Sequence, residues 1–133
     1  MRGVLAALYS VAVYAFFLAT FVYAILFVEG LVVPKTIDSG EAGELLPSLL
    51  INAGLLGVFA VQHSVMARPG FKKFWTRIVP KEIERSTYVL FASLALALIL
   101  WQWRPLPQLV WSVSDDAAEI AIIALSWSGW ALL

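Results

Sequence analysis

Four long apolar stretches divide this chain of 133 residues, and shorter polar segments separate them. They cover residues 3–28, 45–66, 87–103 and 117–133. A helix rises about 1.5 Å per residue, so about 20 apolar residues cross a hydrocarbon core of roughly 30 Å. The pattern therefore predicts four transmembrane helices in one domain, an all-α fold. The third stretch is short and needs polar residues at its start to complete the crossing.

The segment between Pro69 and Pro80 has a helical pattern of its own. Large apolar residues recur there at i, i+3, i+4 and i+7: Phe71, Phe74, Trp75 and Ile78. Basic residues occupy the other side: Lys72, Lys73 and Arg77. This arrangement is typical of a short amphipathic helix lying on anionic headgroups, and the alternative is a solvated connector. Since proline suits a first helical turn, one helix is expected to run from about Pro80 into the third span.

Composition supports the membrane assignment and excludes several kinds of chemistry. Hydrophobic residues make up 62% of the chain and charged residues 14%, whereas soluble domains have about 25% charged residues. Cysteine is absent and there is one histidine, so a thiolate or multi-histidine metal site is excluded. The formal net charge of zero gives no reason to expect nucleic-acid binding, and the lipid bilayer is the expected partner. The oligomeric state stays open.

The distribution of charge predicts the orientation. Residues 68–85 hold six basic and two acidic side chains, a balance of +4. The preceding loop, 29–44, carries −3, and residues 104–119 carry −2. Basic loops stay on the cytoplasmic side, so the N-terminus is predicted in the cytoplasm and the protein in the cytoplasmic membrane.

Polar residues of the second span predict a site near its cytoplasmic end. Asn52 and His63 are three helical turns apart, on a stripe with Leu56, Phe59 and Met66 that is expected to face the interior of the bundle. Gly54, Gly57 and Val61 lie opposite and favour close approach of another helix. The start of the third span should emerge on the same side. We therefore expect five side chains to converge: His63, Arg68, Glu84, Arg85 and Tyr88.

Purely structural roles are the alternative for the same residues. Glu84 and Arg85 would then simply pair with other loop charges, which is the commoner role of such residues, and a neighbouring backbone group or tyrosine would satisfy His63. A stripe of the first span and a pair of small residues in the third span are assigned to helix packing: Tyr9, Phe16, Thr20, Tyr23, Ser93 and Ala97. The residues alone therefore predict a helical membrane protein with a cytoplasmic polar cluster.

Three motifs extend this interpretation: His63-Ser64-Val65-Met66-Ala67-Arg68, Glu84-Arg85-Ser86-Thr87-Tyr88-Val89 and Trp101-Gln102-Trp103-Arg104-Pro105. In this order and at these separations they resemble the methanethiol S-methyltransferases, which are related to NnrU-like membrane proteins and isoprenylcysteine carboxyl methyltransferases. The resemblance covers most of residues 45–111. It implies transfer of a methyl group from S-adenosylmethionine to methanethiol, giving dimethyl sulfide.

Under this resemblance, His63 would accept the thiol proton, and Arg68 or Arg85 would stabilise the thiolate. The catalytic candidates are therefore His63, Arg68, Glu84 and Arg85. The candidates for contact with the substrate are Asn52, Gln62, Ser64 and Tyr88. No metal is expected.

The chain departs from the family in length. Family members are about twice as long, and the related carboxyl methyltransferases hold the cofactor around a later Arg-His-Pro motif, which is absent here. We therefore expect a truncated N-terminal part that neither binds the cofactor well nor turns over alone, with the cofactor residues outside it. Two alternatives remain: a non-catalytic NnrU-like protein linked to nitrogen-oxide metabolism, and a structural or transport bundle.

Overall fold

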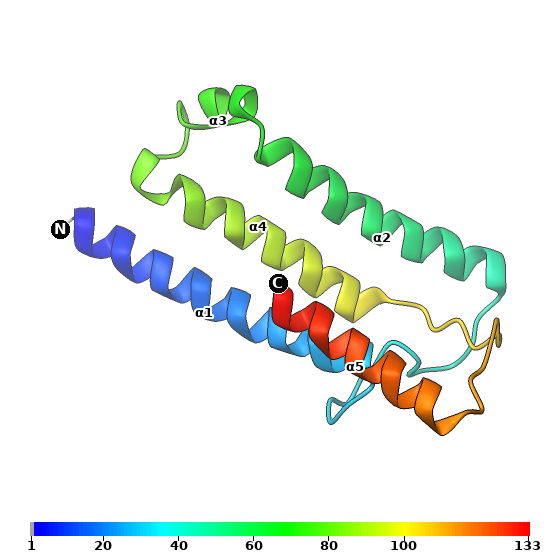
Figure 1. Ribbon diagram of the computed structural model, residues 1–133. Coiled ribbons are helices and arrows are strands. Elements are labelled where there is room, and N and C mark those ends of the chain that lie inside the picture. Colours follow the sequence, from blue (N-terminus) through cyan, green and yellow to red (C-terminus); the bar gives the residue numbers. More distant parts are fainter. Residues whose placement is uncertain (1) are drawn as a thin grey trace.

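Five helices make up the part of the chain that the structure, a computed structural model, describes: residues 2–133. They are α1 (Arg2–Glu29), α2 (Leu45–Met66), α3 (Pro69–Trp75), α4 (Lys81–Gln102) and α5 (Asp116–Leu132) (Figure 1). The all-α prediction is confirmed. The predicted continuous helix from about Pro80 is also confirmed, because α4 begins directly after this residue.

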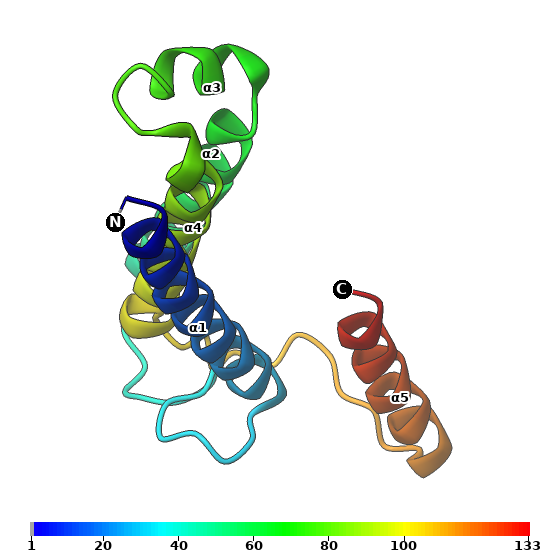
Figure 2. The same cartoon turned by 90° about the vertical axis from the view of Figure 1, so that its left-hand side faces the viewer.

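Three of these helices are long and apolar enough to cross a membrane: α1, α2 and α4. The protein is therefore an integral membrane protein. The predicted fourth span corresponds to α5, which has 17 residues. Figure 2 shows α5 standing apart from the other long helices.

The long helices form a layer with α4 in the centre, packed against α1 on one side and α2 on the other. Near the beginning of α1, the Tyr9 hydroxyl lies 3.1 Å from Thr87 Oγ1. Near its end, the Phe27 ring meets Trp103 edge-on at 6.4 Å between centroids. The residues of α1 and those at and beyond α4 pair in the same order along the sequence, so α1 and α4 run parallel. Helix α2 runs antiparallel to both (Figure 1).

Small and hydroxyl-bearing residues form part of the contact between α1 and α4. Ser93 is 1% exposed and donates a hydrogen bond to the carbonyl oxygen of Val89, one turn earlier. Ser86 donates to Ser10 of α1 at 2.7 Å. Small residues let membrane helices approach closely, and hydroxyls bonded in this way leave no polar group facing lipid. The predicted packing roles of Ser93 and Tyr9 are therefore confirmed.

The amphipathic segment forms a shorter helix than its pattern predicts. α3 has seven residues, and Ile78 lies beyond its end, 66% exposed. Phe71 stacks on Trp75, and Trp75 meets Phe91 of α4 edge-on at 6.2 Å. The prediction that the helix extends to Ile78 is wrong, because the chain must turn after Trp75 to reach Pro80 and begin α4.

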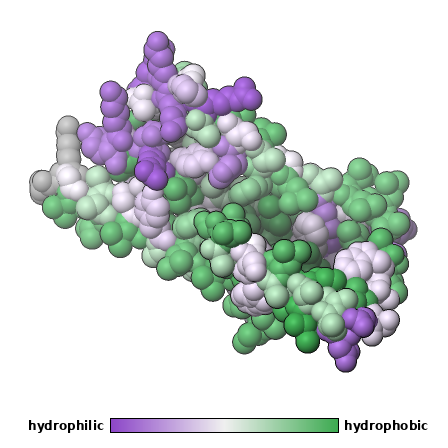
Figure 3. All heavy atoms as spheres, viewed as in Figure 1, coloured by the Kyte–Doolittle hydropathy of each residue, from purple (hydrophilic) through white to green (hydrophobic). Residues whose placement is uncertain are grey.

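Polar residues gather at the end of the layer that carries α3. Figure 3 shows hydrophilic side chains over α3 and the adjoining start of α4, a second small patch at the beginning of α5, and apolar side chains over most of the remaining surface in view. This separation fits a protein whose long helices lie in lipid and whose α3 end lies at a water-facing surface.

Helix α5 joins α1 through one carboxylate. The indole N–H of Trp130 donates to Glu29 Oε1 at 2.7 Å, and the hydroxyl of Ser126 donates to the same oxygen. The Trp130 ring also meets Phe21 edge-on. Asp115 accepts a hydrogen bond from the Ala118 N–H at 2.9 Å, so the sequence itself caps the start of α5.

Candidate functional site

The end of α2 and the beginning of α4 bring His63 and Tyr88 together. The Tyr88 hydroxyl oxygen lies 3.1 Å from His63 Nδ1 and donates to the His63 carbonyl oxygen at 3.4 Å. Phe59, one turn before His63, stacks on the imidazole with 5.4 Å between ring centroids. The short α3 connection makes this pairing possible, because it returns the chain beside the end of α2 (Figure 1).

These contacts allow a tautomer of His63 in which Nδ1 carries the proton. If the Tyr88 O–H donates to the His63 carbonyl, the phenol oxygen is free to accept a proton from Nδ1–H. A neutral imidazole that donates through Nδ1 has an unprotonated Nε2, which is an acceptor. The imidazole is exposed, so this nitrogen can meet a small protic molecule.

The face of α2 that packs on α4 is turned slightly from the predicted stripe. Asn52 and Met66 are buried as expected, but Leu56 is 49% exposed and His63 is exposed. Gln62 is half-buried at this end of α2. Its Nε2 donates to Met66 Sδ at 3.2 Å, and its Oε1 is buried without a hydrogen-bond partner among the described residues.

The charged candidates lie at the same end of the layer as this pair. Arg68 precedes the first residue of α3, where it is exposed, and Arg85 is exposed on the second turn of α4. Glu84 is half-buried in the first turn of α4, where the positive end of the helix dipole favours a carboxylate. Ser64 is exposed next to His63. The structure therefore places seven of the eight candidates at one end: His63, Arg68, Glu84, Arg85, Gln62, Ser64 and Tyr88.

Asn52 is the exception, because it lies toward the other end of α2. Its Nδ2 donates to the Arg104 carbonyl at 2.8 Å, and its Oδ1 accepts from the Arg104 N–H at 2.9 Å. The side chain is 4% exposed. Both polar groups of the amide are thus engaged by the backbone that follows α4, three turns away from His63 along α2.

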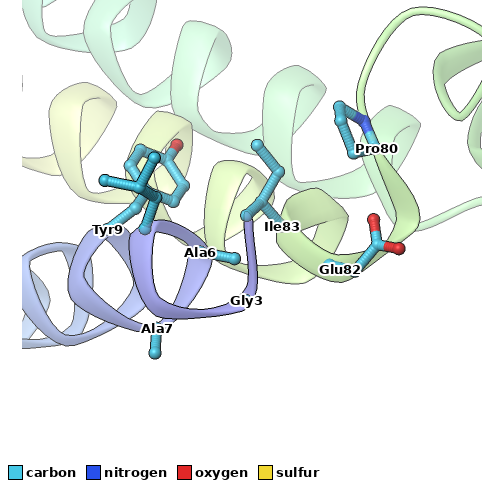
Figure 4. Close-up of a pocket in the computed structure, with 8 residues that line it drawn as sticks. Gly3, Ala6, Ala7, Tyr9, Pro80, Glu82 and Ile83 are labelled. Atoms are coloured by element: carbon cyan, nitrogen blue, oxygen red, sulfur yellow. The ribbon is translucent and has the colours of Figure 1, made fainter. Parts of the chain in front are cut away.

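A groove of about 870 Å³ opens on the other side of α4, between its start and the start of α1. Figure 4 shows Gly3, Ala6, Ala7 and Tyr9 on the α1 side and Pro80, Glu82 and Ile83 on the α4 side. None of the eight candidates lines it. The sequence gives one signal for the groove, the small residues Gly3, Ala6 and Ala7, but only the parallel pairing of the two helices shows what they face.

The described residues do not provide a complete set of contacts for S-adenosylmethionine. This molecule carries a charged amino-acid end and ribose hydroxyls, which require several hydrogen-bonding partners. Among the residues that the structure describes, those lining the groove between α1 and α4 offer mainly apolar atoms, and Glu82 is the charged side chain in this lining. The His63–Tyr88 pair lies on the α2 side of α4, away from that groove. The described residues therefore do not by themselves fit this cofactor.

The arrangement defines a class: a helical integral membrane protein with a histidine–tyrosine pair and flanking charges at one end of its spans. Comparison with known proteins is more specific. Methanethiol S-methyltransferase 1 of Bradyrhizobium diazoefficiens is 54% identical over 129 residues, covering 97% of this chain and 45% of that protein. Methanethiol S-methyltransferase of Mycobacterium tuberculosis is 53% identical over 131 residues, covering 98% of this chain and 54% of that protein. The resemblance predicted from the motifs is confirmed.

The chain spans about half the length of these curated relatives. A weaker similarity, 34% identity over 82 residues, connects it to Nurim of Xenopus laevis, covering 60% of this chain and 25% of that protein. No family model matches the chain, and no solved structure matches it significantly.

Proposed function

We propose that this chain is part of a membrane methyltransferase that passes a methyl group from S-adenosylmethionine to methanethiol, giving dimethyl sulfide. One observation carries the proposal: about half of the residues are identical, over nearly the whole chain, to two proteins named for this reaction. Because the chain spans about half of each relative, the activity is proposed for a protein of their full length. The residues that hold the methyl donor are expected outside this chain.

In this proposal, His63 and Tyr88 prepare the thiol. The thiolate is the nucleophilic form of a thiol, so the reaction needs an acceptor for its proton. Nε2 of His63 is that acceptor, provided that Nδ1–H is held by Tyr88, whose oxygen lies 3.1 Å away. The exposed Arg68 and Arg85 are positioned at the same end to favour the developing negative charge. Glu84 would orient one of these guanidinium groups.

The membrane arrangement is also proposed. We place the α3 end in the cytoplasm, because residues 68–85 carry a balance of +4. The N-terminus then lies in the cytoplasm, the membrane is the cytoplasmic membrane, and α5 is a fourth span. A small apolar thiol partitions into lipid, whereas the methyl donor is dissolved in the cytoplasm. A site at this surface would therefore receive both.

A chimera tests the function directly. This chain would replace the 129 matched residues of the Bradyrhizobium diazoefficiens relative, and the protein would be expressed in cells that produce no dimethyl sulfide. Cells fed with methanethiol should release dimethyl sulfide, measured in the gas phase. The intact relative is the positive control. A chimera that reaches the membrane in a folded form but gives no dimethyl sulfide would refute the proposal.

Single substitutions in the active chimera test the roles. His63→Ala and Tyr88→Phe should both lower kcat/KM, because the first removes the proton acceptor and the second removes the group that holds its tautomer. Removal of a general base typically costs about 10²–10⁴-fold. Val61→Ala, on the exposed face of the same helix, is the matched control. Unchanged rates in both site variants would remove the pair from the mechanism.

A further inference from the structure

A second groove lies between α1 and α4 at the end opposite to His63. It has a volume of about 490 Å³, and its lining includes Ala19, Tyr23, Ala97 and Trp101. The two alanines leave room between the helices, and the aromatic rings form the walls. The α1 residues of this groove extend over about two turns, or about 10 Å, which suits part of an acyl chain.

Lys35 lines the mouth of this groove. Its ammonium donates to the carbonyl oxygen of Trp101 in the last turn of α4, and its own carbonyl accepts from the Tyr23 hydroxyl at 3.2 Å. An ammonium has three donors, so two remain for another ligand. The loop that carries Lys35 is further attached by Ile37, whose N–H donates to the Phe27 carbonyl at 3.0 Å. The cation is therefore held in place at the rim.

A second cation stands near Lys35. Burial, and to a lesser extent the neighbouring charge of Arg104, lowers the pKa of Lys35. Two cations that disfavour each other's charge form a position where an anion is stabilised by both. Asn52 bonds to both backbone groups of Arg104, so the point from which this side chain extends is held just beyond the end of α4.

We propose that this groove binds an anionic phospholipid, with an acyl chain between Ala19 and Ala97 and the phosphate beside Lys35 and Arg104. The side chains of the groove match both parts of such a molecule. Apolar walls receive the chain, and the cations receive the headgroup at the depth where Trp101 and Tyr23 mark the interface. Helix α5 leaves the groove open, since its contacts Phe21 and Glu29 lie on another face of α1.

Quenching of tryptophan by brominated lipids tests this proposal. Trp101 is 72% exposed and lines the groove, so a variant that keeps Trp101 and has phenylalanine at the other tryptophans reports on its occupant. In nanodiscs, brominated phosphatidylglycerol should quench Trp101 more strongly than brominated phosphatidylcholine at equal mole fraction. One basic residue near the membrane surface corresponds to a preference of about fivefold.

Matched variants separate a site from general lipid contact. Lys35→Gln should reduce the preference to about onefold, and Lys35→Arg should keep it. A variant that retains Trp111 alone, which is 65% exposed and outside the groove, should be quenched equally by both lipids. Native mass spectrometry of the unmodified chain, with and without Lys35→Gln, gives an independent measure of retained phosphatidylglycerol. Equal retention of phosphatidylglycerol in these two proteins would overturn the proposal.

Discussion

Replacement of Asn52 by alanine should destabilise the protein without altering the chemistry of the His63 end. The substitution removes two hydrogen bonds, at 2.8 and 2.9 Å, that join α2 to the backbone after α4. A hydrogen bond contributes about 0.5–1.5 kcal/mol net, and buried groups that lose their partners cost more. Since Arg104 is exposed and water can replace part of the loss, we expect about 2 kcal/mol in total.

This loss should appear as a change of about 30-fold in the unfolding equilibrium constant. The equilibrium can be measured by circular dichroism in mixed micelles as the fraction of denaturing detergent is raised. Asn52→Asp retains the acceptor but loses the donor. Its stability should lie between those of the unchanged protein and Asn52→Ala if the carboxyl is neutral, and should be lower if the carboxylate stays charged. Val58→Ala, on the exposed side of α2, is the control. A stable Asn52→Ala protein whose only defect in the active chimera is a raised KM for methanethiol would refute this reasoning and support a substrate-binding role.

Three further predictions concern other parts of the fold. Ser93→Leu should lower stability by about 1–3 kcal/mol in the same unfolding assay, because the side chain is 1% exposed and overpacking forces α1 and α4 apart. Glu29→Ala should raise hydrogen exchange in residues 116–132 and leave α4 unchanged, since it removes the acceptor shared by α5. A cysteine introduced at Lys73 should react with membrane-impermeant maleimide only after the cells are opened, whereas labelling of intact cells would contradict the proposed orientation.

Much of the fold follows from local sequence. The bounds of α2 equal those of the predicted second span, and the other spans are located within a few residues except at the start of α4. There, the apolar run begins at Thr87, but the helix starts at Lys81, as predicted from Pro80 and the acidic residues Glu82 and Glu84, which favour a helix start before the apolar run. The length of α3 could not be predicted, since it depends on where the chain must turn to bring Trp75 against Phe91.

The candidate site was less predictable. The spacing of about 100° per residue shows which residues share a face of a helix, but the neighbouring helices determine which face is buried. Asn52 and His63 share a stripe in the sequence, yet one is clamped by the backbone of Arg104 and the other is exposed beside Tyr88. No periodicity reveals that a backbone segment beyond α4 offers a donor and an acceptor to the Asn52 amide. For the same reason, the groove lined by Tyr9 and Glu82 could not be predicted from the sequence.

Successive residues of α4 connect the two sides of the layer. Ser86 and Thr87 bond to Ser10 and Tyr9 of α1, and the next residue, Tyr88, bonds to His63 of α2. A rotation or shift of α4 large enough to break the first two bonds would therefore also move the phenol that orients the imidazole. The hydroxyls between α1 and α4 consequently do more than satisfy one another inside the membrane, because they fix the rotation of α4 on which the geometry of the His63–Tyr88 pair depends.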